Sequence, residues 1–164
     1  GNQIGKSVKE ENCEKIIEEI FETSKQHSCS IIYPLDVLVG KNLNGVSKAK
    51  ALNEINSDDL ILDIGPKTID KIKNIIENSE TVLWNGPAGY FENPNFANGS
   101  YEIAKAIVKK NKNNSIYSVV GGGDTIALLN KINVIRDFNF VSTAGGAFLE
   151  YLEGKDLPGI KALS

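Results

Sequence analysis

The chain has few of the side chains on which many enzyme active sites are built. Its 164 residues include one histidine, two cysteines and no methionine, and Arg136 is the only arginine beside 17 lysines. Arginine-based bidentate recognition of a carboxylate or sugar phosphate is therefore scarce. With His27 as the only histidine, a Ser–His–Asp triad has little support, and Cys13 and Cys29 with His27 do not make a standard zinc site.

Charge and hydropathy narrow the possible partners. A net charge of −3 argues against a nucleic-acid binder, which would show a basic stripe. No signal peptide opens the chain and no apolar run has the length of a membrane span, so we expect no membrane partner and a cytoplasmic location. With 41% apolar and 24% charged residues, the composition is that of one globular domain. Both cysteines are expected to be reduced packing residues, and His27 a surface residue.

Hydrophobic periodicity predicts alternating helices and strands. Helices are expected over residues 7–26, 66–78, 98–110, 124–131 and 147–152, and strands over 30–33, 35–39, 80–84, 115–120 and 138–142. Ser7 is a candidate N-cap, with Glu10 as its capping-box partner. Residues 47–55 are ambiguous, and 60–64 form a short apolar run. The sustained alternation after residue 80 predicts a parallel sheet with helices on its faces.

The segment SIYSVVGGGDTIALLN, residues 115–130, is the most informative one. An apolar strand runs into three glycines, and a helix follows. Glycines let the backbone approach a ligand closely, and the free N–H groups of a helix start favour negative charge. Asp124 adds a carboxylate, which fits a Mg²⁺ ion between the protein and phosphates. The first hypothesis is therefore a site for a polyphosphate with a bound cation.

Two further loops follow strands in the same way. They are NGPAGYFE at residues 85–92 and STAGG at 142–146, and ligands of open α/β sheets bind beyond the carboxyl ends of the strands. One glycine loop alone is equally consistent with ordinary turn chemistry. Three such loops at one edge of a sheet favour a phosphate or nucleotide site. GxxxxGK[ST] is absent, which excludes a P-loop, and the absence of GxGxxG weakens a dinucleotide site.

Several residues of these loops have a structural as well as a functional interpretation. Asp124 and Thr125 could cap the helix instead of binding metal or phosphate. Glu92 could accept hydrogen bonds from a ribose or be a solvated loop charge. Trp84 and Phe91 could pack an adenine, although aromatic residues near a strand end more often belong to the core.

Five sequence blocks resemble the phosphoglycerate kinase family. They are GNQIGKS, DIGPKT, VLWNGPAGYFE, SVVGGGDT and VSTAGGAFLEYLEGKDLPGIKAL, in the family's order and across nearly the whole chain. The resemblance implies a three-layer α/β/α, Rossmann-like parallel sheet. It identifies residues 1–164 as part of the carboxy-terminal, nucleotide-binding domain, without the amino-terminal substrate domain. The opening Gly1-Asn2-Gln3-Ile4-Gly5, which looks like the middle of a loop, is consistent with a piece of a longer chain.

By this resemblance the chain takes part in reversible phosphoryl transfer from 1,3-bisphosphoglycerate to ADP, giving 3-phosphoglycerate and ATP in glycolysis. The parent enzyme is expected to be a monomeric phosphotransferase that uses Mg²⁺ with the nucleotide, and the chain alone to be inactive. Asp124 would contact the Mg²⁺-nucleotide and Glu92 the ribose. The remaining nucleotide contacts implied are Gly122, Gly123 and Thr125 at the phosphates, Asn85, Gly86 and Phe91 along the nucleotide, and Ile61 and Leu62 near the base.

The same resemblance assigns Gly145 and Gly146 to the phosphoryl group in transfer. Ala144 stands where the family usually has glycine, and its methyl group restricts φ beside these amides. Two other classes remain as alternatives: a dinucleotide-dependent oxidoreductase domain, and a non-catalytic module in which the glycines only make turns. If strands of the sheet are missing, an apolar face is exposed, and the chain is expected to be marginally stable or to associate.

Overall fold

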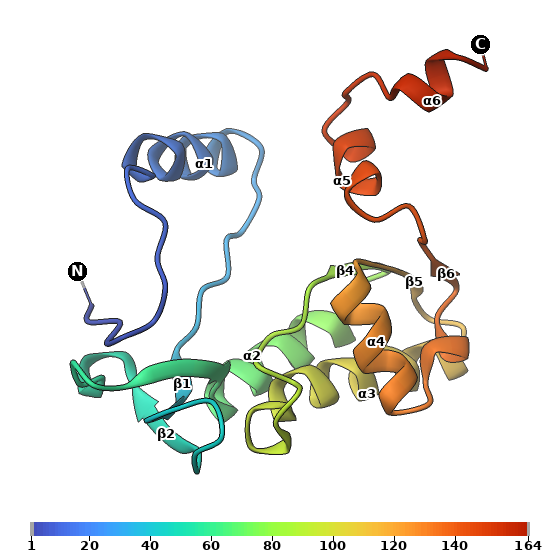
Figure 1. The fold of residues 1–164 in the computed structure, drawn as a ribbon. Helices are drawn as coiled ribbons and strands as arrows, with labels where there is room; N and C mark the ends of the chain where they lie inside the picture. Colours follow the sequence, from blue (N-terminus) through green and yellow to red (C-terminus); the bar gives the residue numbers. More distant parts are fainter. Residues whose placement is uncertain (1, 164) are drawn as a thin grey trace.

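The computed structural model describes residues 2–163; Gly1 of the opening motif and Ser164 lie outside the described part. The chain alternates helices with strands from residue 66 onward (Figure 1). The elements are α1 (Glu14–Gln26), β1 (Asp36–Gly40), β2 (Lys48–Ala51), η1 (Leu52–Glu54), β3 (Leu60–Ile64), α2 (Pro66–Glu77), β4 (Thr81–Asn85), η2 (Pro94–Phe96), α3 (Asn98–Lys112), β5 (Tyr117–Gly121), α4 (Gly123–Lys131), η3 (Ile135–Asp137), β6 (Phe140–Val141), α5 (Gly146–Leu152) and α6 (Pro158–Lys161).

The later strands form the expected parallel sheet, in the order β4-β5-β6. Trp84 and Val120 point to one face of this sheet and are buried with Ile107 of α3 and Leu128 of α4 in the main hydrophobic core. Burial of these β-branched and aromatic side chains fixes which helices lie against that face. The predicted α/β class with a parallel sheet and flanking helices is confirmed.

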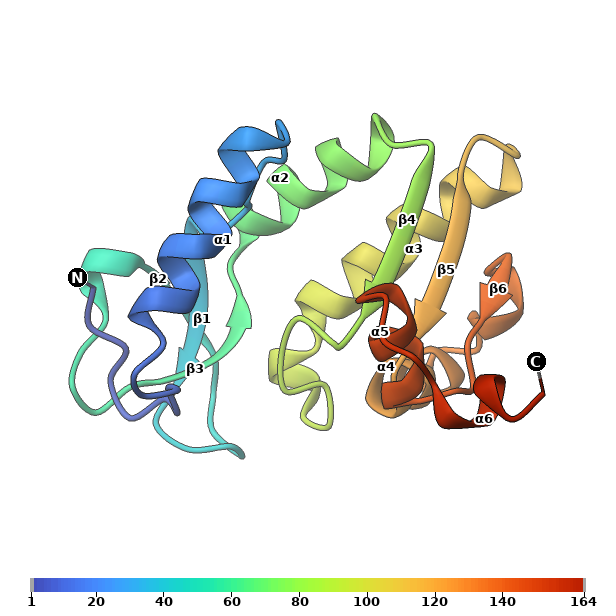
Figure 2. The same cartoon turned by 90° about the horizontal axis from the view of Figure 1, so that it is seen from above.

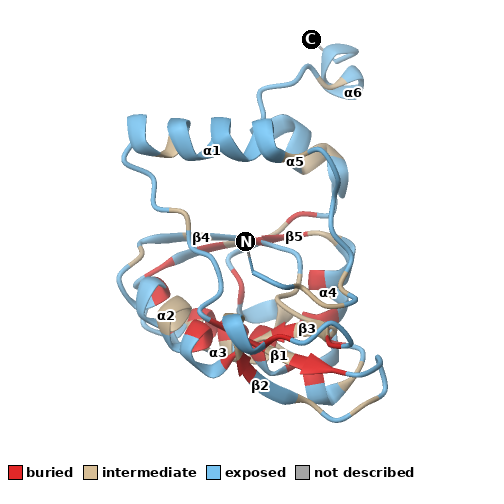
Figure 3. Cartoon of the chain, turned by 90° about the vertical axis from the view of Figure 1, so that its left-hand side faces the viewer, coloured by how far each residue is buried: buried red, intermediate tan, exposed pale blue. Residues whose placement is uncertain are grey.

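The opposite face of the parallel sheet has little cover. Leu83, Tyr117 and Phe140, one from each strand, are each about half exposed on it. Helices α1 and α5 lie on this side and α2 and α3 on the other (Figures 1 and 3). No residue of α1 or of α5, both fully described, is buried. The third layer is therefore present but packs loosely, which is unusual because parallel sheets are normally covered on both faces.

The earlier strands form a second, antiparallel sheet in the order β2-β1-β3. The strand expected at 35–39 and the apolar run at 60–64 are β1 and β3, and the ambiguous segment 47–55 contains β2. The polar turn at residues 41–45 makes a hairpin of β1 and β2, so the alternation rule for parallel sheets does not extend to this part.

Two secondary-structure predictions in the first 33 residues are wrong. The helix expected from Ser7 begins at Glu14, because Asn12 has a φ of 59°, which a helix cannot continue through. Ser7 caps nothing there; its Oγ accepts a hydrogen bond of 2.8 Å from the N–H of Ile61 in β3. Residues 30–33 are not assigned to a strand in the described structure, since the chain runs out from α1 to β1 without pairing.

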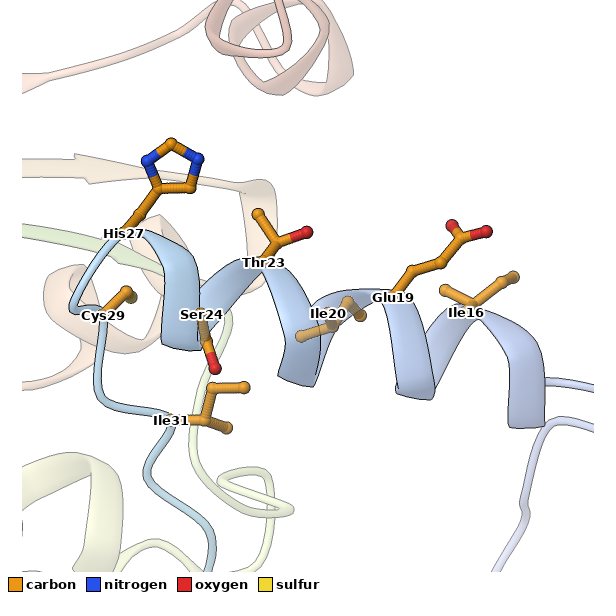
Figure 4. A pocket seen from close by; sticks show the side chains of 8 residues that line it. All are labelled: Ile16, Glu19, Ile20, Thr23, Ser24, His27, Cys29 and Ile31. Carbon is orange, nitrogen blue, oxygen red and sulfur yellow. The ribbon is translucent and has the colours of Figure 1, made fainter.

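The segment after α1 borders a cavity of about 500 Å³ (Figure 4). Ile16 and Ile20 of α1 line it together with Ile31, so the apolar stripe of the helix does not pack against the core. His27 is exposed, as predicted. Cys13 and Cys29 are free thiols, but Cys29 is exposed, so its assignment as a packing residue is wrong. No helix of the described chain is long and apolar enough to cross a bilayer.

Two buried carboxylates have structural partners in the antiparallel half. Asp36 accepts hydrogen bonds from the N–H groups of Lys67 (3.1 Å) and Thr68 (2.9 Å) at the start of α2. Burial raises the pKa of Asp36, but these donors outweigh it and the net pKa lies below its usual value. Asp59 pairs with Lys41 and Lys50, and those two ammonium groups hold its pKa well below the usual range.

Candidate functional site

The three glycine-containing loops meet at the carboxyl edge of the parallel sheet. Asn85 and Gly121 are register partners at the ends of β4 and β5, and the N–H of Ser142 donates to Val120 O at 2.8 Å, which places the end of β6 beside them. Figure 2 shows β4 and β5 side by side, with α4 and α5 near their carboxyl ends. Segments 85–92, 121–125 and 142–146 are thus neighbours, as the strand pattern predicts.

The loop after β5 leads directly into a helix. Gly122 has a φ of 86° and is the N-cap of α4, so the position requires glycine. A Cβ there would also lie 3.0 Å from Asn85 Oδ1, because the Asn85 side chain lies against this loop. The first hydrogen bond of α4 at its amino-terminal end runs from the Ile126 N–H to Gly122 O at 3.1 Å. The N–H groups of Gly123 and Asp124 precede it and belong to the helix start, where N–H groups favour an anion.

Asp124 is the second residue of α4 and its side chain is exposed. It forms no hydrogen bond or ion pair with any residue that the structure describes, and Gly122 rather than Asp124 is the N-cap. The capping alternative for Asp124 is therefore wrong. Its carboxylate is available at the edge where the loops meet.

Thr125 joins two of the loops. It is fully buried, and its Oγ1 accepts a hydrogen bond of 2.7 Å from the N–H of Gly86. Trp84 holds the same turn from the other side, because its indole Nε1 donates to Gly86 O at 2.8 Å. The side chain of Thr125 thus fixes the position of Gly86 relative to α4, a function that sequence reasoning did not assign to it.

The middle and end of the 85–92 loop are held by other elements. The N–H of Ala88 donates to Ser100 Oγ in α3 at 2.9 Å, and the N–H of Tyr90 donates to Leu62 O in β3 at 2.7 Å. Lys131 of α4 donates to Phe91 O at 3.0 Å, with its ammonium 5.8 Å from the Phe91 ring centroid. These bonds tie the loop to β3, α3 and α4, so its conformation is well defined.

The side chains predicted on this loop have different environments. Asn85 and Glu92 are exposed, and Glu92 lies beside a cavity of about 300 Å³ together with Asn44 and Tyr90. Trp84 and Phe91 are buried in the main core, so the core interpretation of both aromatic residues is confirmed. The backbone of Phe91 is also engaged, because its N–H donates to Gly89 O at 2.9 Å and its carbonyl oxygen accepts from Lys131.

Ile61 and Leu62, predicted near a base, lie half-buried in β3. They line a cavity of about 330 Å³ whose other walls include Ala88, Gly89 and Tyr90 of the 85–92 loop. The structure thus brings this pair next to the loop of Glu92. The sequence alone could not show that proximity, because β3 belongs to the other sheet.

The third loop is the most open of the three. Gly145 has a φ of 57° and precedes Gly146, the first residue of α5. A Cβ on either glycine would meet no described atom within 4 Å, and Ala144 beside them is exposed. The backbone here is accessible, but neighbouring side chains do not enclose it.

The described residues hold no group of three or more His, Cys, Asp or Glu side chains placed to bind a metal ion. Magnesium commonly binds through one or two carboxylates together with substrate phosphates. The free carboxylate of Asp124 fits that mode, in which the ion arrives with a polyphosphate ligand.

The fold and the loop geometry define a parallel α/β domain with glycine-rich turns joined at its carboxyl edge. The chain belongs to the phosphoglycerate kinase family, because the model of that family matches residues 1–155. Among curated relatives, phosphoglycerate kinases of Chelativorans sp. (strain BNC1) and Caulobacter vibrioides (strain NA1000 / CB15N) are 39% and 44% identical over 99% of this chain. The chain spans 42% of the length of each.

Solved structures give the same family. The phosphoglycerate kinase of Coxiella burnetii superposes with a TM-score of 0.89 at 38% identity, covering 98% of this chain and 41% of that chain. The phosphoglycerate kinase of Pyrococcus horikoshii OT3 gives a TM-score of 0.71 at 29% identity, and the match covers 98% of this chain and 40% of that chain. The family predicted from the five sequence blocks is thus confirmed, and so is a partial span of the family's length.

Proposed function

We propose that the chain is the nucleotide-binding part of a phosphoglycerate kinase, a glycolytic phosphotransferase. The reaction would be reversible phosphoryl transfer from 1,3-bisphosphoglycerate to ADP, giving 3-phosphoglycerate and ATP. The observation that carries the proposal is the junction of three glycine loops at one sheet edge, with Thr125 joined to Gly86, in a chain of this family. Such an edge, with a helix start and a free carboxylate, suits a magnesium nucleotide.

Each residue has a proposed part that follows from where it lies. The exposed carboxylate of Asp124 would hold Mg²⁺, and the N–H groups around Gly122 and Gly123 would bind phosphate oxygens. Thr125 would act mainly by fixing Gly86, since its hydroxyl oxygen is engaged there. The other proposed contacts are Asn85, Gly86 and Phe91 along the nucleotide, Glu92 at the ribose, Ile61 and Leu62 near the base, and Gly145 and Gly146 at the transferred phosphoryl group.

The chain's own contribution is to orient the nucleotide and to supply amide donors where phosphate charge develops. Mg²⁺, when bound, would neutralise charge on the phosphate oxygens. The chain spans 42% of the length of its relatives, and we propose that 3-phosphoglycerate would bind to an amino-terminal substrate domain outside residues 1–164 and that the chain alone does not turn over. A cytoplasmic location and a monomeric full-length enzyme belong to the same proposal.

The test is titration of Mg²⁺-ADP and, separately, NAD into the ¹⁵N-labelled chain, with amide shifts followed by NMR. The proposal predicts shifts concentrated at residues 85–92 and 121–125 with Mg²⁺-ADP, and weaker binding of NAD. Asp124→Asn should weaken binding, whereas Asp156→Asn, on an exposed carboxylate between α5 and α6, serves as the charge-matched control. Absence of shifts at millimolar Mg²⁺-ADP contradicts nucleotide binding, and turnover in a coupled assay contradicts inactivity of the isolated chain.

A further inference from the structure

One buried carboxylate has no part in the nucleotide contacts proposed above. Asp63 of β3 is 2% exposed. Its Oδ2 accepts a hydrogen bond of 2.8 Å from the N–H of Gly99, and its Oδ1 accepts one of 2.8 Å from the N–H of Ile64. No lysine, arginine or histidine of the described chain pairs with it. Burial of a carboxylate without a cation is costly, so its retention here calls for a physical reason.

The packing around this carboxylate involves two glycines from different elements. A Cβ built on Gly89, in the middle of the 85–92 loop, would lie 2.5 Å from Asp63 Oδ1. A Cβ on Gly99, in the first turn of α3, would collide with the same oxygen. The loop and the helix therefore both approach the carboxylate as closely as glycine permits.

Neighbouring hydrogen bonds converge on the same place. Leu62, the residue before Asp63, accepts the N–H of Tyr90, and Ser100, the residue after Gly99, accepts the N–H of Ala88. The backbone of residues 88–90 is thus bonded on both sides of the carboxylate. Asp63 also lines the 330 Å³ cavity beside Ile61 and Leu62.

We propose that Asp63 is a positioning residue for the nucleotide site: its carboxylate bonds the start of α3 to β3 through Gly99, and it sets the position of the 85–92 loop, whose Gly89 packs directly against it. It would touch no nucleotide itself. Its effect would reach the ligand through the loop that carries Asn85, Gly86 and Glu92. The inference rests on the proposed function, because that loop is the proposed nucleotide contact.

The ionisation of Asp63 offers a way to observe this coupling. Burial raises the pKa of Asp63 to about 6, and the N–H donors of Gly99 and Ile64 only partly oppose it. Protonation weakens the carboxyl group as a hydrogen-bond acceptor. None of the titratable groups on the neighbouring elements bonds to Asp63 in the described structure. They are Asp36 of β1, Tyr90 and Glu92 of the loop, and Tyr101, Glu102, Lys105, Lys109, Lys110 and Lys112 of α3.

The first experiment needs no ligand and no variant. Amide shifts of Gly89, Tyr90 and Gly99 in the ¹⁵N-labelled chain are followed between about pH 4.5 and about pH 8. We expect the three amides to titrate together with a midpoint of about 6, since one carboxylate would control them. Independent midpoints, a midpoint near that of an ordinary aspartate, or no movement would overturn the proposal.

The second experiment compares Asp63→Asn with Asp70→Asn, which removes an exposed carboxylate from α2. Mg²⁺-ADP affinity is measured by calorimetry for both variants and the unchanged chain. At about pH 7.5, Asp63→Asn should raise Kd about tenfold, the scale of one charge-assisted hydrogen bond, and Asp70→Asn should not. The ratio of Kd for Asp63→Asn to that of the unchanged chain should fall towards one at about pH 5, because the carboxyl group is then protonated in the unchanged chain too.

The ratio separates positioning from a general structural function. Titration of the ADP phosphates changes the Kd of Asp63→Asn and of the unchanged chain by the same factor, so it cancels in their ratio. A ratio of one at about pH 7.5, or a ratio that stays constant with pH, contradicts the proposal. If Asp63→Asn does not fold, the amide titration of the unchanged chain decides. If the unchanged chain does not bind Mg²⁺-ADP at all, the proposed function is refuted, and so is the proposal that Asp63 positions a nucleotide site. The ligand-free titration then still shows whether Asp63 holds the loop.

Discussion

Replacement of Thr125 by valine tests the bond that joins the loops after β4 and β5. Valine keeps the shape of threonine but lacks the oxygen that accepts the Gly86 N–H at 2.7 Å. A net hydrogen bond contributes about 1 kcal/mol, and because Gly86 is exposed, water replaces part of the lost bond. We therefore expect unfolding free energy to fall by about 1 kcal/mol, and Gly86 hydrogen exchange to quicken by about fivefold.

Thr125→Ser is the matched control. Serine keeps the hydroxyl group and loses one buried methyl group, so its stability should also fall by about 1 kcal/mol. Denaturant unfolding alone does not separate the two variants, but two other assays do. Only valine should quicken exchange at Gly86 and weaken Mg²⁺-ADP binding. Equal exchange at Gly86 in both variants would refute the view that Thr125 fixes the turn.

Three other predictions follow from the fold. Leu128→Ala, at a fully buried core position, should lower the unfolding free energy by about 2–5 kcal/mol in urea titration; a loss below about 1 kcal/mol contradicts the core assignment. The pKa of Asp36 is lower in the folded than in the unfolded chain. The Asp36 carboxylate therefore stabilises the fold fully at pH values above its unfolded-state pKa, and this stabilisation is lost as the pH falls through its folded-state pKa. Asp36→Asn should thus destabilise the chain at neutral pH, with a smaller difference at about pH 2; equal loss at both pH values refutes this. Tyr117→Lys, on the half-exposed sheet face, should reduce concentration-dependent association in sedimentation velocity, and a chain that is already monomeric and high-melting contradicts that expectation.

Local sequence signals predicted the parallel half of the molecule well. The alternation of strand and helix patterns after residue 80 predicted the bounds of β4, α3, β5, α4, β6 and α5 to within a few residues. It did so because hydrophobic periodicity and the glycine-containing turns indicate the same boundaries there. The three loops at one edge followed from the rule that parallel strands end on the same side.

The antiparallel half was harder to predict for a physical reason. Its strands are short, and β3 pairs with β1 rather than with the parallel sheet, a long-range choice that periodicity does not encode. Ser7 looked like a helix cap, but its hydroxyl bonds β3, 54 residues away in sequence. The surroundings of Asp63 could not be predicted for the same reason, since Gly99, which donates to its carboxylate, and Gly89, which packs against it, lie on distant segments.

The most direct test of the account is a crystal structure of the chain with Mg²⁺-ADP. We predict the phosphates against the N–H groups of residues 122–124, with the metal ion at the Asp124 carboxylate and the ribose towards Glu92. Nucleotide bound at any other place, with the turns after β4 and β5 unoccupied, would contradict the central claim that these loops together form the nucleotide site.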